Sequence, residues 1–461
     1  MKNHCYIFER KNESYAFDTY LFYVLKITKE QKALLSKLMQ MEEEEFYKTI
    51  IYDEGLKYCF QNGLFFSKIS SNTKVEEKNL FSLSFTPSHN CNLRCKYCFA
   101  RHGNNFQGKE KKLSEKTIEM SLKYFKKYIE KRDSVLRIDL IGGGENFLNP
   151  IAIEMINQYA KDIYRKVEVW ICTNGTIFND EVKKIIGEKN VSLGISLDGN
   201  KSVNDANRLN ESGKSVYDEI IKNVSSIKNE SNTNPKLRNL WGMVVVTEDS
   251  DSLYQILKHH KKIGFSTVQM KIVRKDKYSV KEIFKIIDLY SELVNNLLED
   301  LKEGTITYLT MIINDNDYFG KIIKRLILNQ RITRRCSAGR SKFSIDAEGN
   351  IYPCDPFVGY NEFILGNVFD NNTDPFDSVF YDLSTKERKP CSNCWANYIC
   401  GGDCLHNSWI GEGNILKNRA FFCEIQKELI QLALILFFEL CQDKNIFDRL
   451  HHFLLARDEL K

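Results

Sequence analysis

Ten of the fourteen cysteines in this 461-residue chain fall into two spaced sets. The first set is the triplet Cys91-x3-Cys95-x2-Cys98, and the second begins at Cys336 and ends at Cys423. Thiolates hold iron–sulfur clusters, usually four to a cubane, so this layout predicts clusters. A triplet at so tight a spacing leaves one iron without a protein ligand. An open iron is where a substrate can bind.

Composition limits the classes of partner. The 66 basic and 61 acidic residues give a net charge of +5, too small to favour nucleic acid as a partner. The first fifteen residues carry charges where a signal peptide has an apolar run. The apolar stretch Leu429–Cys441 is too short to span a bilayer and predicts a buried helix. We therefore expect a cytoplasmic protein without a membrane partner, whose clustered cysteines bind metal.

The pattern along the chain predicts five structured segments and one linker. We expect a small α+β unit at 1–70, a polar linker at 71–79 and alternating strands and helices at 81–277. After these we expect a helical connector at 278–335, a loop-rich cysteine segment at 336–425 and a C-terminal helix at 426–461. In the first unit, the runs Cys5–Glu9 and Ser14–Asp18 flank a Lys-Asn turn signal, and two helical patterns follow at 28–41 and 43–62.

Six short apolar runs within residues 81–277 predict parallel strands. They are Ser82–Thr86, Leu136–Ile141, Val167–Thr173, Ser192–Ser196, Trp241–Val246 and Thr267–Ile272. Helical patterns, including Lys116–Glu130 and Ile151–Ile163, lie between them. Such alternation is typical of βα units. The predicted fold class is therefore α/β, a partial (β/α)6 TIM-like barrel with its chemistry at the carboxyl ends of the strands.

The triplet Cys91, Cys95 and Cys98, with Tyr97 before the last cysteine, resembles the signature of the radical S-adenosylmethionine (SAM) superfamily. The resemblance implies a [4Fe–4S] cluster on these three catalytic cysteines, with SAM on the fourth iron and cleavage of SAM to a 5′-deoxyadenosyl radical. The alternative is a zinc knuckle. Zinc takes four ligands in closed sites, and only His89 and His102 flank the loop.

Polar residues at the ends of the other strands extend the resemblance and imply SAM contacts. Gly143-Gly144-Glu145-Asn146 resembles the family's Gly-Gly-Glu-Pro loop, with Asn in place of Pro, and Asn204-Asp205-x2-Arg208 resembles a segment whose arginine pairs with the SAM carboxylate. The full set implied to bind SAM is Tyr97, Gly143, Gly144, Glu145, Thr173, Asn174, Ser196, Asp198 and Arg208. A tight βα turn explains the glycines equally well, and a structural ion pair explains Asp198 and Arg208.

The second cysteine set resembles the SPASM extension of radical SAM enzymes that modify peptides. The resemblance implies two auxiliary [4Fe–4S] clusters, and hence three clusters in all. By position, it implies that one cluster is fully ligated by Cys391, Cys394, Cys400 and Cys423. The other cluster is implied to have three ligands, Cys336, Cys354 and Cys404, and therefore one open iron. Zinc ribbons are the alternative. Of the remaining cysteines, Cys172 and Cys441 are expected to be small core residues.

The stretch from Tyr15 to Thr28 and the helices after it resemble the winged-helix-like recognition element of ribosomal-peptide maturases. In that family a leader peptide adds as a strand to the sheet edge. A DNA-binding winged helix and a purely structural cap are alternatives, and the acidic run Glu42–Glu45 disfavours DNA.

Together these resemblances imply a maturase that cross-links a ribosomally made precursor peptide, with cysteine thioethers as the expected product. The expected partners are the precursor peptide, with its leader and a cysteine-containing core, and a reducing electron donor such as flavodoxin or ferredoxin. Carbon–carbon or carbon–oxygen cross-linking and oxidation of a protein residue, as in sulfatase maturation, are alternatives. A non-catalytic leader-binding scaffold is an alternative from outside the enzymes, and the intact triplet disfavours it.

Overall fold

The computed structural model describes residues 2–41, 45, 49, 53–67, 80–98, 113–131, 133–233, 239–370 and 372–459. The chain divides into two compact units. Unit 1 comprises Met1–Glu76, Lys277–Arg335 and Ser384–Lys461, and unit 2 comprises Glu77–Asp276 and Cys336–Leu383. The predicted cysteine segment 336–425 therefore contributes to both units. The predicted linker at 71–79, His102 and most of the acidic run 42–45 lie outside the described residues.

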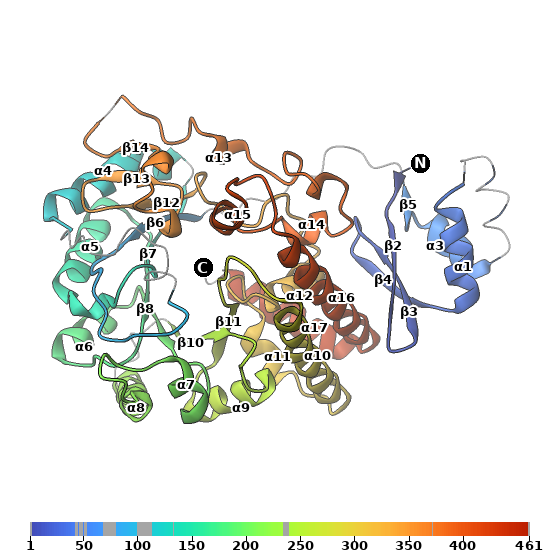
Figure 1. Cartoon of the computed structure of the whole chain (residues 1–461), viewed down its shortest axis with the longest axis horizontal. Coiled ribbons are helices and arrows are strands. Elements are labelled where there is room, and N and C mark those ends of the chain that lie inside the picture. Colours follow the sequence, from blue (N-terminus) through green and yellow to red (C-terminus); the bar gives the residue numbers. More distant parts are fainter. Residues whose placement is uncertain are drawn as a thin grey trace. The chain divides into compact units, whose positions relative to one another are not determined.

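Unit 2 is built on the six predicted strands, which pair in chain order and in parallel. The fold class is confirmed: a mostly parallel, partial barrel (Figure 1). The observed strands are β6 Leu80–Phe85, β7 Val135–Leu140, β8 Val167–Thr173, β9 Val191–Ser196, β10 Asn239–Val246 and β11 Thr267–Ile272.

Helices follow these strands because apolar residues alternate along each strand and one face must be covered. Leu83, Ile138 and Ile171 belong to the apolar core of this unit, while their neighbours Ser84 and Asp139 are buried polar residues. The helices are α4 Glu115–Lys131, α5 Pro150–Ile163, α6 Asp180–Ile186, α7 Lys201–Asn207, α8 Tyr217–Thr233 and α9 Leu253–Ile263. The barrel thus has an apolar side against its helices and polar groups among its strands.

Three short strands extend the sheet beyond β6. They are β12 Lys342–Ile345, β13 Asn350–Tyr352 and β14 Gly366–Asn367, with helix α13 Val379–Asp382 further along. Strand β12 pairs in parallel with β6, so that Ser344 lies beside Ser84. The sequence did not reveal these strands because they are too short for a clear alternating pattern. Gly349, in the turn before β13, has a φ of +83°, a region that favours glycine.

Unit 1 begins with a three-stranded antiparallel sheet of β2 Cys5–Arg10, β3 Glu13–Asp18 and β4 Tyr23–Ile27. Lys11 and Asn12 both have positive φ, the type I′ geometry of a two-residue hairpin, as the turn signal predicted. Helices α1 Lys29–Leu38 and α3 Glu54–Gln61 follow, and β1 Lys2–Asn3 pairs with β5 Phe66–Ser67. Much of the predicted helix at 43–62 lies outside the described residues before α3.

The rest of unit 1 is largely helical. Its helices are α10 Val280–Lys302, α11 Thr307–Ile312, α12 Gly320–Ile327, α14 Asn397–Cys400, α15 Leu405–Glu412, α16 Ala420–Gln442 and α17 Lys444–Glu459. The apolar stretch Leu429–Cys441 forms most of α16, whose side chains from Leu429 to Leu440 are largely buried, as predicted. The expectation that Cys441 is a core residue is wrong: Cys441 is exposed at the end of that helix.

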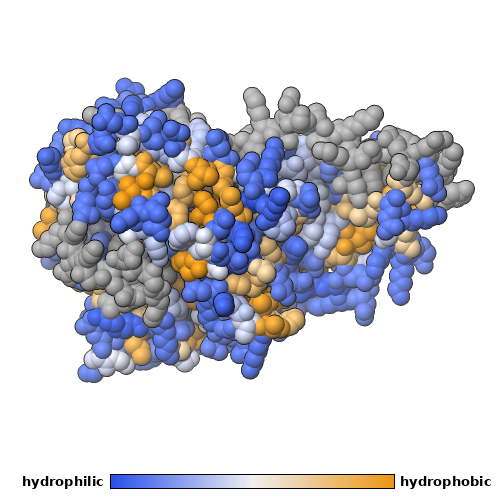
Figure 2. All heavy atoms as spheres, turned by 45° about the horizontal axis from the view of Figure 1, so that its top comes forward, coloured by the Kyte–Doolittle hydropathy of each residue, from blue (hydrophilic) through white to orange (hydrophobic). Residues whose placement is uncertain are grey.

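Two observations concern the surface. Among the residues that the structure describes, no helix combines the length and hydropathy needed to cross a bilayer. The face drawn in Figure 2 is mostly hydrophilic, and its hydrophobic side chains gather in separate patches.

Candidate cluster and cofactor sites

The triplet Cys91, Cys95 and Cys98 lies in the loop that follows β6. The loop is fixed by its backbone, because the amides of Arg94 and Lys96 donate to the carbonyls of Leu209 and Asn207 at 2.8 and 3.0 Å. Burial raises the pKa of the Cys95 thiol to about 11, Arg208 opposes that rise, and the Cys98 and Cys91 thiols add to it. The structure therefore brings the three predicted ligands together on one anchored loop.

The glycine-rich loop after β7 packs directly on the cysteine loop. The amide of Gly144 donates to the carbonyl of Ser88 at 3.1 Å, and the amide of Glu145 donates to the carbonyl of Asn90 at 2.7 Å. A Cβ atom on Gly144 would lie 2.2 Å from the Asn90 carbonyl oxygen. Glycine is needed at position 144 because the two backbones approach closely. This requirement is separate from the predicted contact of Gly144 with SAM.

The Glu145 side chain joins the ends of two strands. Its carboxylate accepts from the Thr173 hydroxyl at 2.6 Å, the Asn174 amide at 2.7 Å and the Phe147 amide at 3.1 Å. Burial raises the pKa of this carboxyl, and the bonds from Asn174, Thr173 and Phe147 oppose the rise. Glu145 thus holds the Thr173–Asn174 turn at the end of β8 against the loop after β7.

Asn146 replaces the proline of the family pattern and is almost fully buried. Its Nδ2 atom donates to the carbonyls of Leu140 and Cys172 at 2.8 and 2.7 Å. These bonds tie the loop to the carboxyl ends of β7 and β8. A hydrogen-bonded side chain therefore restrains the loop where a proline ring would restrain the backbone.

Asp198 and Arg208 form a buried ion pair in which the Arg208 Nε lies 3.1 Å from the Asp198 Oδ2. Asp198 also accepts from the Tyr97 hydroxyl and, at 3.0 Å, from the Val245 amide. Burial works against the charge on Arg208, but Asp198 and Tyr97 outweigh it and raise the pKa of the guanidinium. The ion pair considered as an alternative in the sequence analysis is thus present. A role of Asp198 and Arg208 in binding SAM stays a prediction.

Two further contacts reach the cysteine sulfurs. The Asn174 Nδ2 lies 3.9 Å from the Cys91 Sγ, and an Arg208 Nη lies 4.0 Å from the Cys95 Sγ. Ser196, at the end of β9, lies 3.7 Å from the Cys172 Sγ. Asn174, at the carboxyl end of β8, and Arg208 therefore lie beside sulfurs of the triplet, on the side where a partial barrel places its chemistry.

Four cysteines of the second set gather in unit 1. Burial raises the pKa of the Cys423 thiol to about 12, and the neighbouring Cys400, Cys391 and Cys394 thiols raise it further. Cys400 is the last residue of α14, and Cys423 lies in the first turn of α16. The structure thus brings together the four thiols of the predicted fully ligated cluster, although Cys423 is distant from the others in the sequence.

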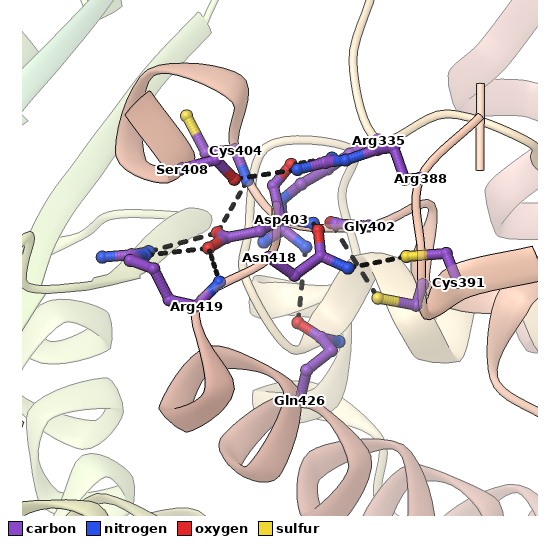
Figure 3. Close-up of polar contacts among 11 residues, drawn as sticks. Arg335, Arg388, Cys391, Gly402, Asp403, Cys404, Ser408, Asn418, Arg419 and Gln426 are labelled. Carbon is purple, nitrogen blue, oxygen red and sulfur yellow. Dashed lines mark hydrogen bonds and ion pairs between the residues drawn. The ribbon is translucent and has the colours of Figure 1, made fainter. Parts of the chain in front are cut away.

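A network of buried polar residues surrounds these cysteines (Figure 3). The Asp403 carboxylate accepts from the Cys404 amide at 2.7 Å and from the Arg419 Nε at 2.8 Å. Asn418 donates to the Cys391 sulfur at 2.7 Å. The sequence did not indicate roles for Asp403, Asn418 and Arg419, because the contacts among them form only when residues 391–404 and 418–423 come together. Their nearness to Cys404 and Cys423 in the sequence was the only available signal.

Cys336 and Cys354 belong to unit 2, and Cys404 belongs to unit 1. The grouping of these three cysteines stays a prediction. Asp355, which follows Cys354, pairs with the Lys342 Nζ at 3.0 Å, and Lys342 also lies 3.3 Å from the Asp139 carboxylate. The sequence did not indicate this charged group, since Lys342 and Asp139 are brought together only by the pairing of β12 with β6.

None of the fourteen cysteines forms a disulfide, so no disulfide competes with metal binding. In the described parts of the chain, no three Cys, His, Asp or Glu side chains converge closely enough to hold a single metal ion. The donor sets fit iron–sulfur clusters in their chemistry, because each consists of cysteine thiols, the usual ligands of such clusters.

Comparison with known proteins gives two family matches. Residues 85–257 match the radical SAM superfamily, and residues 336–395 match the SPASM iron–sulfur cluster-binding domain. The first match contains the triplet and every predicted SAM contact. The second contains Cys336, Cys354, Cys391 and Cys394.

Two curated relatives and one solved structure resemble the chain. A cysteine-type anaerobic sulfatase-maturating enzyme of Clostridium novyi is 26% identical over 77% of this chain and 95% of its own length. The radical SAM cyclopropyl synthase TigE of Paramaledivibacter caminithermalis is 24% identical over 79% of this chain and 75% of its own. The solved structure of native anSMEcpe with bound AdoMet has a TM-score of 0.63 at 20% identity, covering 80% of this chain and all of that chain.

The fold, the cysteine triplet and the family matches define an enzyme of the radical SAM class. More particularly, it is a radical SAM enzyme with a SPASM domain, which binds SAM and a [4Fe–4S] cluster in its first domain and further iron–sulfur clusters in the second.

Proposed function

We propose that this enzyme installs intramolecular cysteine thioethers in a ribosomally made precursor peptide. The observation that carries the proposal is the N-terminal sheet, which packs on the cysteine-rich segment of unit 1. The Tyr6 ring stacks on Trp395, the residue after Cys394, with ring centroids 3.7 Å apart. Among the described residues, β2 and β4 each pair with β3 alone. A leader peptide added to one of these edges would therefore bind beside an auxiliary cluster.

The proposed ligand sets are those that the family resemblance implies from the positions of the cysteines. Cys91, Cys95 and Cys98 hold the cluster that binds SAM, and Cys391, Cys394, Cys400 and Cys423 hold one auxiliary cluster. Cys336, Cys354 and Cys404 supply three thiolates to the other auxiliary cluster. A cubane usually takes four, which leaves a position for a thiolate of the substrate.

When bound, SAM and its reduced cluster supply a 5′-deoxyadenosyl radical that abstracts one hydrogen atom from the peptide. The chain positions the reactants: Glu145 and Asn146 fix the loops at the strand ends, and Arg208 adds a buried positive charge beside Cys95. Closure of each carbon–sulfur bond would also release the thiol proton and one electron, and the auxiliary cluster held by Cys336, Cys354 and Cys404 would supply the acceptor for that electron. The peptide thus loses two hydrogens for each link. A soluble one-electron donor, flavodoxin or ferredoxin in the cytoplasm, would reduce the SAM cluster.

Anaerobic co-expression with a cysteine-containing precursor peptide, followed by mass spectrometry of the peptide, tests the proposal. We expect a loss of two hydrogens per link and cysteines that no longer alkylate. The same loss with every cysteine still alkylating would contradict thioether formation and indicate carbon–carbon or carbon–oxygen links.

Oxidation of a sulfatase residue is a second candidate, because the relatives include cysteine-type and serine-type sulfatase-maturating enzymes. The N-terminal sheet favours the peptide maturase, since we expect a sulfatase-maturating enzyme to lack the recognition element. A sulfatase-derived peptide offered in the same assay separates the two functions: its conversion to an aldehyde, without cross-links in the precursor peptide, would establish the second.

A further inference from the structure

The side chain of Asn418 contacts a predicted cluster ligand and is oriented by other residues. Its Nδ2 atom donates to the Cys391 Sγ at 2.7 Å, and its Oδ1 atom accepts from the Asp403 amide at 3.1 Å. Because the backbone amide can only donate, it fixes the oxygen of Asn418 on its own side and the NH2 group toward the sulfur. Figure 3 shows the amide between these two partners.

Asp403 is itself held rigidly. Its carboxylate is almost fully buried, accepts from the Arg419 Nε and Nη2 at 2.8 and 3.1 Å, and accepts from the Cys404 amide at 2.7 Å. An Nη1 atom of Arg388 donates to the Asp403 carbonyl at 2.6 Å. With both its carboxylate and its backbone restrained, Asp403 presents its amide to Asn418 in one position.

These contacts form a continuous chain of three hydrogen bonds from Cys391 through Asn418 and Asp403 to Cys404. In the proposed ligand sets, Cys391 belongs to the fully ligated auxiliary cluster and Cys404 to the open one. We propose that Asn418 sets the reduction potential of the cluster bound by Cys391 and, through Asp403, couples that cluster to the ligand Cys404. This inference rests on the proposed ligand sets.

The physical reason is electrostatic. Reduction adds a negative charge to the cluster, and a hydrogen bond donated to a ligating sulfur stabilises that charge. Cys391 is buried and Asn418 is half-buried, so water replaces the lost donor poorly. A hydrogen bond to a charged group changes an equilibrium constant by about tenfold or more, which for a one-electron couple is about 59 mV per factor of ten. Asn418 is therefore a positioning residue whose effect appears in a potential.

Two substitutions separate the bond to sulfur from the bond to Asp403. Asn418→Leu keeps the approximate shape and loses both bonds, whereas Asn418→Asp keeps the acceptor for the Asp403 amide and loses the donor to Cys391. Asn393→Asp is the matched control, because Asn393 is exposed in the same cysteine loop and the substitution adds the same charge as Asn418→Asp. All are made in the full chain with Cys91, Cys95 and Cys98 changed to Ala, so that only the auxiliary clusters titrate.

The measurements are iron content and a redox titration followed by electron paramagnetic resonance. We expect Asn418→Leu to lower the equilibrium constant for reduction of one auxiliary cluster by about tenfold. Asn418→Asp should lower it at least as much, and Asn393→Asp should lower it less. An unchanged potential in an iron-replete Asn418→Leu protein would overturn the proposal. So would loss of the cluster in both Asn418 variants but not in the control, since Asn418 would then be structural.

The same titration distinguishes failure of the inference from failure of the proposed function. If the parent protein shows fewer than two auxiliary clusters, the proposed ligand sets are wrong. If Asn418→Leu shifts the potential but the enzyme forms no thioether in any peptide, the proposed function fails and the role of Asn418 stands.

Discussion

The aromatic rings of Tyr6 and Trp395 lie parallel, with an interplanar angle of 7° and centroids 3.7 Å apart. Tyr6 belongs to β2, and its hydroxyl also accepts from the Gln431 Nε2 of α16 at 2.9 Å. Trp395 follows Cys394, so the stack ties the N-terminal sheet to the cysteine loop, and the hydrogen bond ties it to α16. The contact joins the proposed leader-binding element to a proposed cluster ligand.

Tyr6→Ala should loosen the N-terminal sheet and reduce peptide modification while SAM cleavage continues. An aromatic pair contributes about 0.5–1.5 kcal/mol beyond its buried area, and a tethered peptide gains about a hundredfold or more in effective affinity. We expect kcat/KM for the full precursor to fall about tenfold or more, measured beside 5′-deoxyadenosine release. Phe284→Ala is the control, because Phe284 is an exposed aromatic of α10, outside the N-terminal sheet and its edges. Equal losses in both variants would argue against a specific role of the stack.

Cys98→Ala should abolish SAM cleavage, whereas Cys404→Ala should preserve cleavage and lose the cross-linked product. Cys98 belongs to the triplet of the SAM cluster, and Cys404 belongs to the proposed open auxiliary cluster. Chromatography of 5′-deoxyadenosine and mass spectrometry of the peptide measure the two activities separately. Cross-linking that persists in Cys404→Ala would remove the proposed role of that cluster.

Gly144→Ala should cost the enzyme its SAM cluster. The new Cβ atom would lie 2.2 Å from the Asn90 carbonyl oxygen, so the glycine-rich loop or the cysteine loop must move. We expect one cluster fewer by iron analysis and a loss of SAM cleavage. Gly142→Ala is the control, because its Cβ would lie 3.0 Å from the side chain of Asp355 and needs only a small shift. Full iron and activity in Gly144→Ala would mean that the two loops are not rigidly packed.

Asn146→Ala should weaken SAM binding and the stability of the barrel. The substitution leaves the carbonyls of Leu140 and Cys172 without the Asn146 donor, and each unsatisfied buried group costs about 1–3 kcal/mol. A lower melting temperature and a higher Kd for SAM, measured by calorimetry, would agree with this role. Asn146→Pro tests the comparison with the family pattern. If Pro restores SAM binding better than Ala, loop restraint is the property that Asn146 supplies.

His260 should make stability depend on pH. Both ring nitrogens face carbonyl oxygens, of Ile256 at 2.8 Å and Leu197 at 3.0 Å, yet burial lowers the pKa of the imidazole to about 4. An unfolded histidine has a pKa of about 6.5, so below that pH the unfolded chain takes up the proton first. Folding stability is therefore fully present above about pH 6.5 and falls as the pH drops toward about 4.

From about pH 7.5 to about pH 5 the loss attributable to His260 is about 2 kcal/mol. Thermal melting of the holoenzyme measures it, and His260→Gln should flatten the pH dependence relative to the parent protein. His452→Gln, a substitution of an exposed histidine, should leave the slope unchanged. A parent and a His260→Gln protein with equal slopes would show that His260 is already charged when folded.

The sequence by itself determined the barrel and its cysteine triplet. Strands such as Val167–Thr173 and helices such as Ile151–Ile163 follow from local hydrophobic periodicity, which needs no information about distant residues. The hairpin turn at Lys11 and Asn12 and the buried helix at Leu429–Cys441 were predictable for the same reason. The spacing of Cys91, Cys95 and Cys98 is also local, since one loop presents all three.

Only the tertiary structure decided the contacts between residues far apart in the chain. The stack of Tyr6 on Trp395 and the pairing of Lys342 with Asp139 join segments that no periodicity relates. Cys441 illustrates the limit within a helix, because an apolar sequence neighbourhood does not say which side of the helix faces solvent. The bond from Asn418 to Cys391 exists because the backbone of Asp403 fixes one orientation of an amide. The orientation of a side chain depends on three-dimensional packing, so it cannot be predicted from the spacing of residues in the sequence.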